Sequence, residues 1–163
     1  MYNYDLIDHI DTRIKEPKSI IKKMEKKKYE KTYLNLIEKV NDIAGMRIVC
    51  TLKDDIFFIK DLVKQIPDVH ILKEKDYVTN PKPSGYSSYH MIVEVPVKLS
   101  QKTIYVKCEI QIRTLAMDFW ASFEHKVKYK TEQEVNKKTS KELVNCAKMI
   151  SKFDDKMILL KNI

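Results

Sequence analysis

The chain has 163 residues, of which 44% are hydrophobic and 33% charged, and its formal net charge is +8. This balance fits one soluble globular domain with a buried core and excludes an intrinsically disordered chain. No run approaches the roughly 20 apolar residues of a membrane span, and the first residues do not form a secretion signal. Three widely spaced cysteines without a CxxC pair argue against a zinc site or a disulfide framework, so we expect a cytoplasmic protein.

The positive charge is concentrated near the N-terminus. Residues 13–31 contain nine Lys and Arg against three Glu, so this segment holds +6 of the net +8. Such a segment attracts an anion, either nucleic acid or nucleotide phosphates, although a solvated lysine face would look the same. Pro17 suits the first turn of a helix, and Ile20, Ile21 and Met24 follow at helical spacing.

The central part of the chain alternates between helical and strand patterns. The patterns predict, in order, a short helix with Leu34, Ile37 and Val40, a buried strand over 46–52, a helix over 54–66, a strand over 69–77, a polar loop over 79–84 and a strand over 88–97. The helix over 54–66 should bury one face, with Ile56, Ile59, Leu62, Val63 and Ile66.

Residues 104–113 form the clearest strand pattern, because mostly apolar and polar residues alternate strictly. One face would carry Ile104, Val106, Cys108, Ile110 and Ile112. The opposite face would carry Tyr105, Lys107, Glu109, Gln111 and Arg113. This polar face could be an ordinary solvated side of a sheet or the floor of a site.

Two helices are expected to follow this strand. Residues 114–130 contain Met117, Trp120, Phe123 and Val127 as a core face. The last segment repeats apolar residues every three or four positions, at Leu143, Cys146, Ile150, Phe153, Met157 and Leu160. This seam could pack within the chain or against another subunit, and we favour a homo-oligomer. We therefore expect an α+β domain with a mixed β-sheet of about five strands flanked by helices over residues 1–131, and a C-terminal helical extension over residues 132–163.

Several polar residues fit the chemistry of pyrophosphoryl transfer. That reaction requires carboxylates to hold Mg²⁺, cations to neutralise phosphates, and aromatic or guanidinium planes to stack on bases. The candidates are Asp42 and Glu109 as carboxylates, Arg13, Lys15 and Lys23 as cations, and Tyr86 and Arg47 as stacking planes. Each residue alone has an ordinary explanation; an acid before a strand, for example, is commonly a cap.

Four motifs in order resemble a known family. The stretches DIAGMR (42–47), NPKPSGYSSYH (80–90) and EIQIRT (109–114) resemble the synthetase domain of RelA/SpoT-type alarmone enzymes. The stretch AMDFWASFEHK (116–126) resembles the single-domain branch, the small alarmone synthetases. The resemblance implies a nucleotidyltransferase-like fold and a (p)ppGpp synthetase. Such an enzyme transfers the β,γ-pyrophosphate of ATP to the 3′-hydroxyl of GDP or GTP, and also of GMP in some members, and releases AMP.

The resemblance also implies roles for the ATP-side residues. Arg13, Lys15, Ser19 and Lys23 match an Arg-x-Lys-x3-Ser-x3-Lys pattern that binds ATP, and Arg13 and Arg47 would sandwich the adenine.

On the acceptor side, Tyr86 would stack on guanine, Lys82 and His90 would contact the phosphates of GDP or GTP, and Lys75 would lie near the acceptor. Gln111 and Arg113 complete the polar face.

For catalysis, the resemblance implies that Asp42 holds Mg²⁺ between the ATP phosphates. Glu109 would help place Mg²⁺ or take the proton of the acceptor hydroxyl. The resemblance further implies a tetramer. We expect no hydrolase activity, because no His is followed directly by Asp.

Alternatives remain at this point. Ser84 stands where many relatives have Asn, which keeps a pyrophosphokinase with adenosine or RNA acceptors open. A non-catalytic RNA- or nucleotide-binding module is the other alternative, because the basic N-terminal helices could contact RNA and Tyr29 and Tyr33 lie among the lysines. We interpret His125 as a structural or helix-capping residue.

Overall fold

The computed structural model describes residues 5–130 and 136–161 of the chain. Within them, the elements in chain order are β1 (Ile7–Ile14), α1 (Pro17–Lys26), α2 (Tyr33–Lys39), β2 (Ala44–Cys50), α3 (Lys53–Lys64), β3 (His70–Asp76), β4 (Tyr89–Lys98), β5 (Thr103–Thr114), α4 (Leu115–Lys130) and α5 (Lys137–Lys161). The expected α+β class and mixed sheet are confirmed. The boundary expected at residues 131 and 132 lies outside the described residues.

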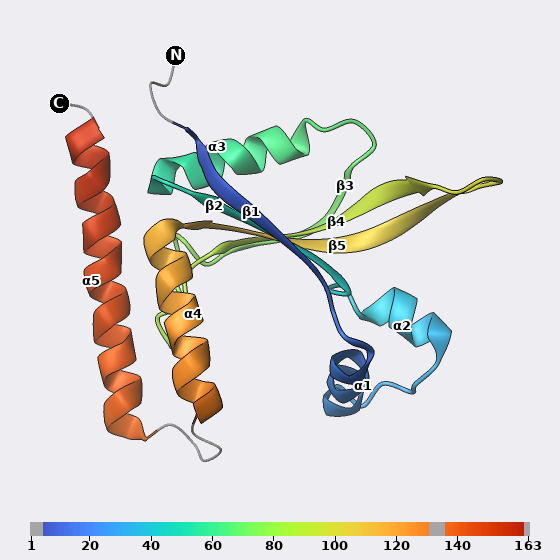
Figure 1. Ribbon diagram of the computed structural model, residues 1–163, viewed down its shortest axis with the longest axis horizontal. Helices are drawn as coiled ribbons and strands as arrows, with labels where there is room; N and C mark the ends of the chain where they lie inside the picture. The colour runs from blue at the N-terminus through green and yellow to red at the C-terminus, as the bar shows by residue number, and fades with distance from the viewer. Residues whose placement is uncertain (1–4, 131–135, 162–163) are drawn as a thin grey trace.

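The sheet has five strands in the order β1-β2-β5-β4-β3. Strands β2 and β5 are parallel, and every other neighbouring pair is antiparallel. In Figure 1, helix α3 lies along one side of the sheet, α4 and α5 stand side by side at one end, and α1 and α2 lie near the opposite end. This arrangement leaves the second face of the central strands between α1 and α4.

Strand β1 was not predicted from the sequence. Apart from the half-buried Ile7, all its residues are exposed, so no period-two apolar pattern marks it. Its pairing with β2 places Arg13 opposite Gly45. Arg13 therefore lies on an edge strand, and the basic helix begins at Pro17, the residue that the sequence placed in its first turn.

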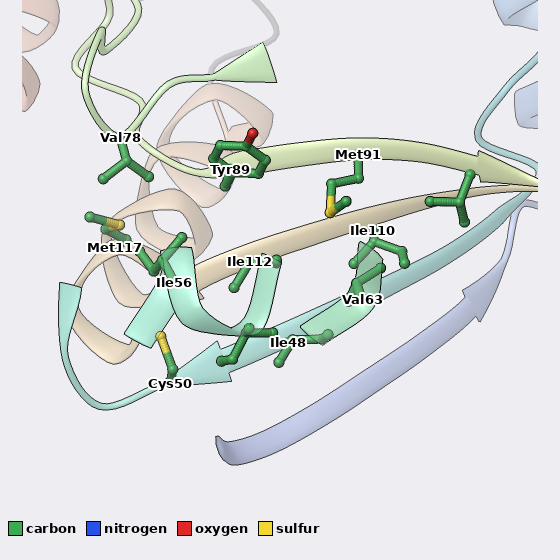
Figure 2. Packing of buried hydrophobic residues seen from close by; sticks show 12 residues of the cluster. Ile48, Cys50, Ile56, Val63, Val78, Tyr89, Met91, Ile110, Ile112 and Met117 are labelled. Atoms are coloured by element: carbon green, nitrogen blue, oxygen red, sulfur yellow. The ribbon is translucent and has the colours of Figure 1, made fainter. Parts of the chain in front are cut away.

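The core lies between α3 and the three central strands (Figure 2). Ile56, Ile59 and Val63 of α3 are at most 6% exposed, as the helical pattern predicted. Leu62 and Ile66 were assigned to the same face and are 41% and 50% exposed. The buried stripe is narrower than predicted, and Ile66 lies beyond the end of the helix at Lys64. The sheet contributes fully or almost fully buried side chains at Ile48, Cys50, Met91, Val93, Ile110 and Ile112.

The two C-terminal helices pack on each other around Trp120. Its indole Nε1 donates a hydrogen bond to the Leu143 carbonyl at 3.0 Å, and Met117 is also buried. Phe123 was predicted to be in the core and is 51% exposed, so that prediction is wrong.

The predicted seam of α5 is only partly correct. Leu143 is buried, but Cys146, Phe153 and Leu160 are exposed. The buried position next to Phe153 is Asp154, whose Oδ2 accepts a hydrogen bond from Thr114 Oγ1 at 2.9 Å. The stripe of α5 that packs within the chain thus follows a different face from the apolar repeat. No helix among the described residues is long and apolar enough to cross a membrane.

Candidate active site

Strand register brings the polar candidates together as two rows across the sheet. In one row, Asp11, Arg47, Gln111, His90 and Lys75 are successive partners on β1, β2, β5, β4 and β3. Because side chains alternate between faces along a strand, residues two positions away share the same face. The neighbouring row therefore joins the same surface.

That neighbouring row contains Arg13, Gly45, Glu109 and Ile92 as successive partners. Gly45 lies between Arg13 and Glu109, and a Cβ built on it would meet Arg13 Cγ at 3.4 Å. Because Gly45 has no side chain, the side chain of Arg13 has room to lie across β2. Glu109 and Gln111 of the predicted polar face both lie on this surface, whereas Tyr105 of the same face is 50% exposed.

Glu109 lies at the centre of this surface. Its Oε1 is 3.2 Å from His90 Nδ1, and its Oε2 accepts a hydrogen bond from Gln111 Nε2 at 3.0 Å. The hydrogen bond from His90 lowers the pKa of Glu109 most, burial opposes it, and the net shift is downward. The carboxylate is therefore ionised at neutral pH and can accept a proton or hold a cation.

A chain of hydrogen bonds behind Glu109 orients His90. Arg113 Nη2 donates to the Tyr86 hydroxyl at 2.6 Å, and that hydroxyl lies 2.7 Å from His90 Nε2. The Glu109 carboxylate can only accept, so His90 Nδ1 carries the hydrogen between the two side chains.

Asp42 is the second carboxylate of the surface, in the loop between α2 and β2. Lys15 Nζ donates to its Oδ2 at 2.8 Å, and Lys23 Nζ lies 2.7 Å from its Oδ1. Burial alone raises the pKa of Asp42, but the two lysines outweigh it and the net shift is downward. Asp42 therefore anchors both lysines of the predicted ATP motif and also acts electrostatically on Glu109.

Two clefts meet at Glu109. The smaller, of about 70 Å³, lies between β1, β2 and β5 and is lined by Asp11, Thr12, Arg13, Gly45, Met46, Arg47, Glu109 and Gln111. The larger, of about 420 Å³, is lined by Lys23, Lys27, Tyr29, Lys39, Asn41, Asp42, Lys73, Lys75, Tyr77, Lys82, His90, Ile92 and Glu109. Six lysines face two carboxylates in the larger cleft, so it suits a polyanion. We call the smaller one the arginine cleft and the larger one the lysine cleft.

The carboxylates fit a magnesium ion held jointly with a substrate. Mg²⁺ is usually bound by one or two carboxylates plus substrate phosphates rather than by a cage of protein ligands. Among the described residues no group of three or more His, Cys, Asp or Glu could hold a metal, whereas Asp42 and Glu109 both line the lysine cleft.

The rings of Tyr77, Tyr86 and His90 lie before, within and after the loop over residues 79–88, and Lys82 of this loop lies over two of them. Lys82 Nζ lies 4.6 Å from the ring centroids of both Tyr77 and Tyr86, and the Tyr77 ring meets His90 edge-on at 5.4 Å. Gly85 lies near the end of the loop with a φ of 92°, a backbone conformation that residues other than glycine rarely adopt.

Four predicted site residues line neither cleft: Lys15, Ser19, Tyr86 and Arg113. Lys15 instead pairs with Asp42, and Arg113 pairs with Asp118. Tyr86 lies behind Lys82, with its hydroxyl bonded to His90 and Arg113. Ser19 is exposed on the first turn of α1. Ser84 Oγ accepts a hydrogen bond from the Tyr86 amide at 3.4 Å, so this residue shapes the loop.

Other residues lie in the site without having been predicted there. Tyr77, Lys39 and Lys73 line the lysine cleft, and Asp118 of α4 contacts two of the predicted arginines. The strand patterns contained a signal for Lys73, which lies two positions before Lys75 on β3 and so shares its face. The contacts of Asp118 depend on the packing of α4 and left no signal in the sequence.

Known proteins resemble this chain over almost its whole length. The signature of the family described as "Region found in RelA / SpoT proteins" matches residues 12–134. GTP pyrophosphokinase YwaC of Bacillus subtilis (strain 168) is 44% identical over 161 residues, which cover 99% of this chain and 77% of the relative.

Two solved structures agree closely with the fold. The small alarmone synthetase 2 from Bacillus subtilis has a TM-score of 0.89 at 43% identity and covers 98% of this chain and 83% of its own. The small alarmone synthetase 1 from the same organism, bound to its product pppGpp, has a TM-score of 0.88 at 35% identity. The match covers 96% of this chain and 79% of that structure's chain.

Proposed function

Because the chain belongs to the RelA/SpoT family, we propose that it is a GTP pyrophosphokinase of the small alarmone synthetase type. It transfers the β,γ-pyrophosphate of ATP to the 3′-hydroxyl of GDP or GTP and releases AMP. The observation that carries this proposal is the position of Glu109, where the arginine cleft and the lysine cleft meet. One carboxylate there can reach both the donor and the acceptor of a phosphoryl group.

The reaction needs one bond to form and one to break. The acceptor 3′-oxygen bonds to the β-phosphorus of ATP, the bond from the β-phosphorus to the oxygen of the α-phosphate breaks, and AMP leaves with that oxygen. The proton of the 3′-hydroxyl passes to a Glu109 carboxylate oxygen. Because the pKa of Glu109 is lowered, it is a weak base, and most of the acceleration comes from positioning and charge neutralisation.

ATP occupies the arginine cleft with its base and the neighbouring edge of the lysine cleft with its phosphates. Arg13 and Arg47 lie on adjacent strands on the same face and provide two guanidinium planes for adenine. Lys15 and Lys23 approach the phosphates from the side of Asp42. Ser19, exposed at the start of α1, would join them through its hydroxyl.

Magnesium completes the site. Asp42 and Glu109 would hold the ion, which supplies charge neutralisation on the ATP phosphates when bound.

The acceptor occupies the lysine cleft. Lys75, Lys82 and His90 line it and suit the phosphates of GDP or GTP. Guanine stacks on Tyr86 only after Lys82 moves off the tyrosine rings, and an incoming phosphate attracts that lysine. Gln111 donates a hydrogen bond to the Glu109 carboxylate, and Arg113 donates one to the Tyr86 hydroxyl, so these two residues position the groups that face the acceptor.

An acceptor panel tests the proposal and its alternative together. Purified protein with Mg²⁺ and ATP is incubated with GMP, GDP, GTP, ADP or a short RNA, and the nucleotides are separated by anion-exchange chromatography. We expect AMP and a guanosine tetra- or pentaphosphate in equal amounts. Product only with ADP or RNA would support the related pyrophosphokinase, and no product with any acceptor from folded protein would overturn the proposal.

Self-association rests on apolar side chains that face outward on the C-terminal helices. Phe153 and Leu160 are 55% and 58% exposed on α5, and Phe119 and Phe123 stack on α4 with ring centroids 6.5 Å apart. We propose a homo-oligomer, a tetramer by resemblance, in the cytoplasm. Light scattering of the protein and of a Phe153→Ser, Leu160→Ser variant tests this, and equal masses would contradict it.

The basic helix α1 offers a second binding surface. Lys18, Lys22 and Lys26 are exposed there, whereas Lys23 is paired with Asp42. We propose that these exposed lysines allow contact with RNA. Binding that falls steeply with salt and is lost on replacing the three by Gln would support this contact.

A further inference from the structure

Asp118 lies where the donor and acceptor halves of the site come into contact. It belongs to the first turn of α4, next to the positive end of the helix, where Thr114 Oγ1 caps the Met117 amide at 3.1 Å. Its side chain is only 16% exposed. The helix sets the position of the Asp118 backbone, and the groups around the carboxylate set where its oxygens lie.

One oxygen of Asp118 serves two arginines. Oδ1 accepts a hydrogen bond from Arg113 Nη1 at 3.1 Å and lies 3.3 Å from Arg47 Nε. The Arg113 side chain is 6% exposed and that of Arg47 is 32% exposed, so both charges are partly removed from water. Two guanidinium groups this close repel each other unless an anion lies between them.

The two arginines lead to different substrates. Arg47 lines the arginine cleft, whereas Arg113 donates to the Tyr86 hydroxyl at 2.6 Å and is bonded to Gln111, both of which lead to Glu109. A shift of either guanidinium changes the position of Asp118 Oδ1 that the other requires. Arg47 and Arg113 therefore move together, and they link the arginine cleft to Tyr86 in the loop over residues 79–88.

We propose that Asp118 is a positioning residue that couples ATP binding to the acceptor site through Arg47 and Arg113. This inference rests on the proposed function, because it assigns the two clefts to ATP and to the guanosine nucleotide. ATP stacking on Arg47 fixes Asp118, and the fixed carboxylate holds Arg113 and Tyr86 in the geometry that binds the acceptor nucleotide. Binding of either nucleotide thereby favours binding of the other.

Asp118→Asn removes the charge and keeps the shape. We expect KM for ATP and KM for GDP each to rise about tenfold, the change that corresponds to ~1.4 kcal/mol, while kcat changes less than about threefold. Asp155→Asn is the matched control, since Asp155 is 58% exposed and forms its ion pair with Lys53 at 2.9 Å, outside both clefts. It should change neither constant.

Arg47→Lys tests the coupling while Asp118 itself stays unchanged. It should raise KM for GDP as well as KM for ATP, because a lysine lacks the second donor that holds both adenine and the carboxylate. Asp118→Glu, which restores the charge, should recover part of the GDP affinity. An unchanged KM for GDP in Arg47→Lys overturns the proposal, even if Asp118→Asn does not fold.

Calorimetry separates this proposal from the proposed function. GDP is titrated into protein alone and into protein saturated with α,β-methylene ATP, whose α–β bridge cannot be cleaved. We expect tighter GDP binding in the second titration for the natural chain and equal binding in both for Asp118→Asn. Equal binding in the natural chain overturns the coupling, whereas coupled binding without turnover overturns only the enzymatic function.

Discussion

The two glycines of the chain allow a matched test of the loop over residues 79–88. Gly85 has a φ of 92°, and a Cβ built on it would lie 2.6 Å from the Ala147 Cβ of α5. Gly45 has no positive φ, and its nearest contact would be the flexible Arg13 side chain at 3.4 Å. We expect Gly85→Ala to destabilise the protein strongly and Gly45→Ala to change stability little.

The magnitude follows from two separate causes. A left-handed conformation costs a residue with a Cβ roughly 1–2 kcal/mol. Forcing an extra carbon into a packed contact adds about 1–3 kcal/mol, because neither the loop nor α5 has a flexible atom there to give way. Gly85→Ala should therefore lower the free energy of unfolding by roughly 2–5 kcal/mol. Gly45→Ala should stay within about 1 kcal/mol.

Urea unfolding followed by Trp120 fluorescence measures the effect, since this indole lies 3.4 Å from the position that a Cβ at Gly85 would take. Ala147→Gly removes the opposing Cβ and should rescue the packing cost of Gly85→Ala but not its conformational cost. The double variant should thus be more stable than the sum of the two single changes predicts. Equal stability of the two glycine variants, or strict additivity with Ala147→Gly, would refute the reasoning.

Three further predictions concern single groups. Burial raises the pKa of Asp154, so its ionised form destabilises the fold at neutral pH, and Asp154→Asn should raise the free energy of unfolding at pH 7. Urea titrations at several pH values should show this gain shrinking as pH falls through the raised pKa and absent below the ordinary range of an aspartate. Burial raises the pKa of the Cys50 thiol to about 12, whereas Cys146 is exposed. Iodoacetamide at pH 8 should therefore alkylate Cys146 first. Peptide mass spectrometry that shows early labelling of Cys50 would contradict its buried position. Lys82→Ala should raise KM for GDP by about tenfold with little change in KM for ATP, since Lys82 lies over Tyr77 and Tyr86 and does not line the arginine cleft. Steady-state kinetics with each substrate varied will show whether the effect is confined to GDP.

Much of the sheet was predictable because its central strands are buried on one face. The alternation over residues 104–113 correctly separated Glu109, Gln111 and Arg113 from the apolar side. Strand β1 escaped because an exposed edge strand has no buried face to impose a pattern. The apolar repeat on α5 was visible, but its direction relative to α4 was not, since the repeat also contained side chains that face outward.

The site was predictable as a set of residues and not as an arrangement. The motifs identified Asp42, Arg47, His90 and Glu109, but pattern alone gives no register between strands that lie far apart in the chain. The row from Arg47 through Gln111 to His90 depends on that register. The bond of Tyr86 to His90 and the position of Lys82 over its ring likewise depend on the loop conformation.

The central claim is that Glu109 promotes pyrophosphate transfer between the two clefts. The most direct measurement is single-turnover product analysis of the natural chain and of Glu109→Gln with Mg²⁺, ATP and GDP. We expect AMP and guanosine tetraphosphate in equal amounts from the natural chain, and a rate lower by about 10²–10⁴ from Glu109→Gln, with affinity for both substrates retained. Formation of ADP in place of AMP, or an unchanged rate in Glu109→Gln, would contradict the account.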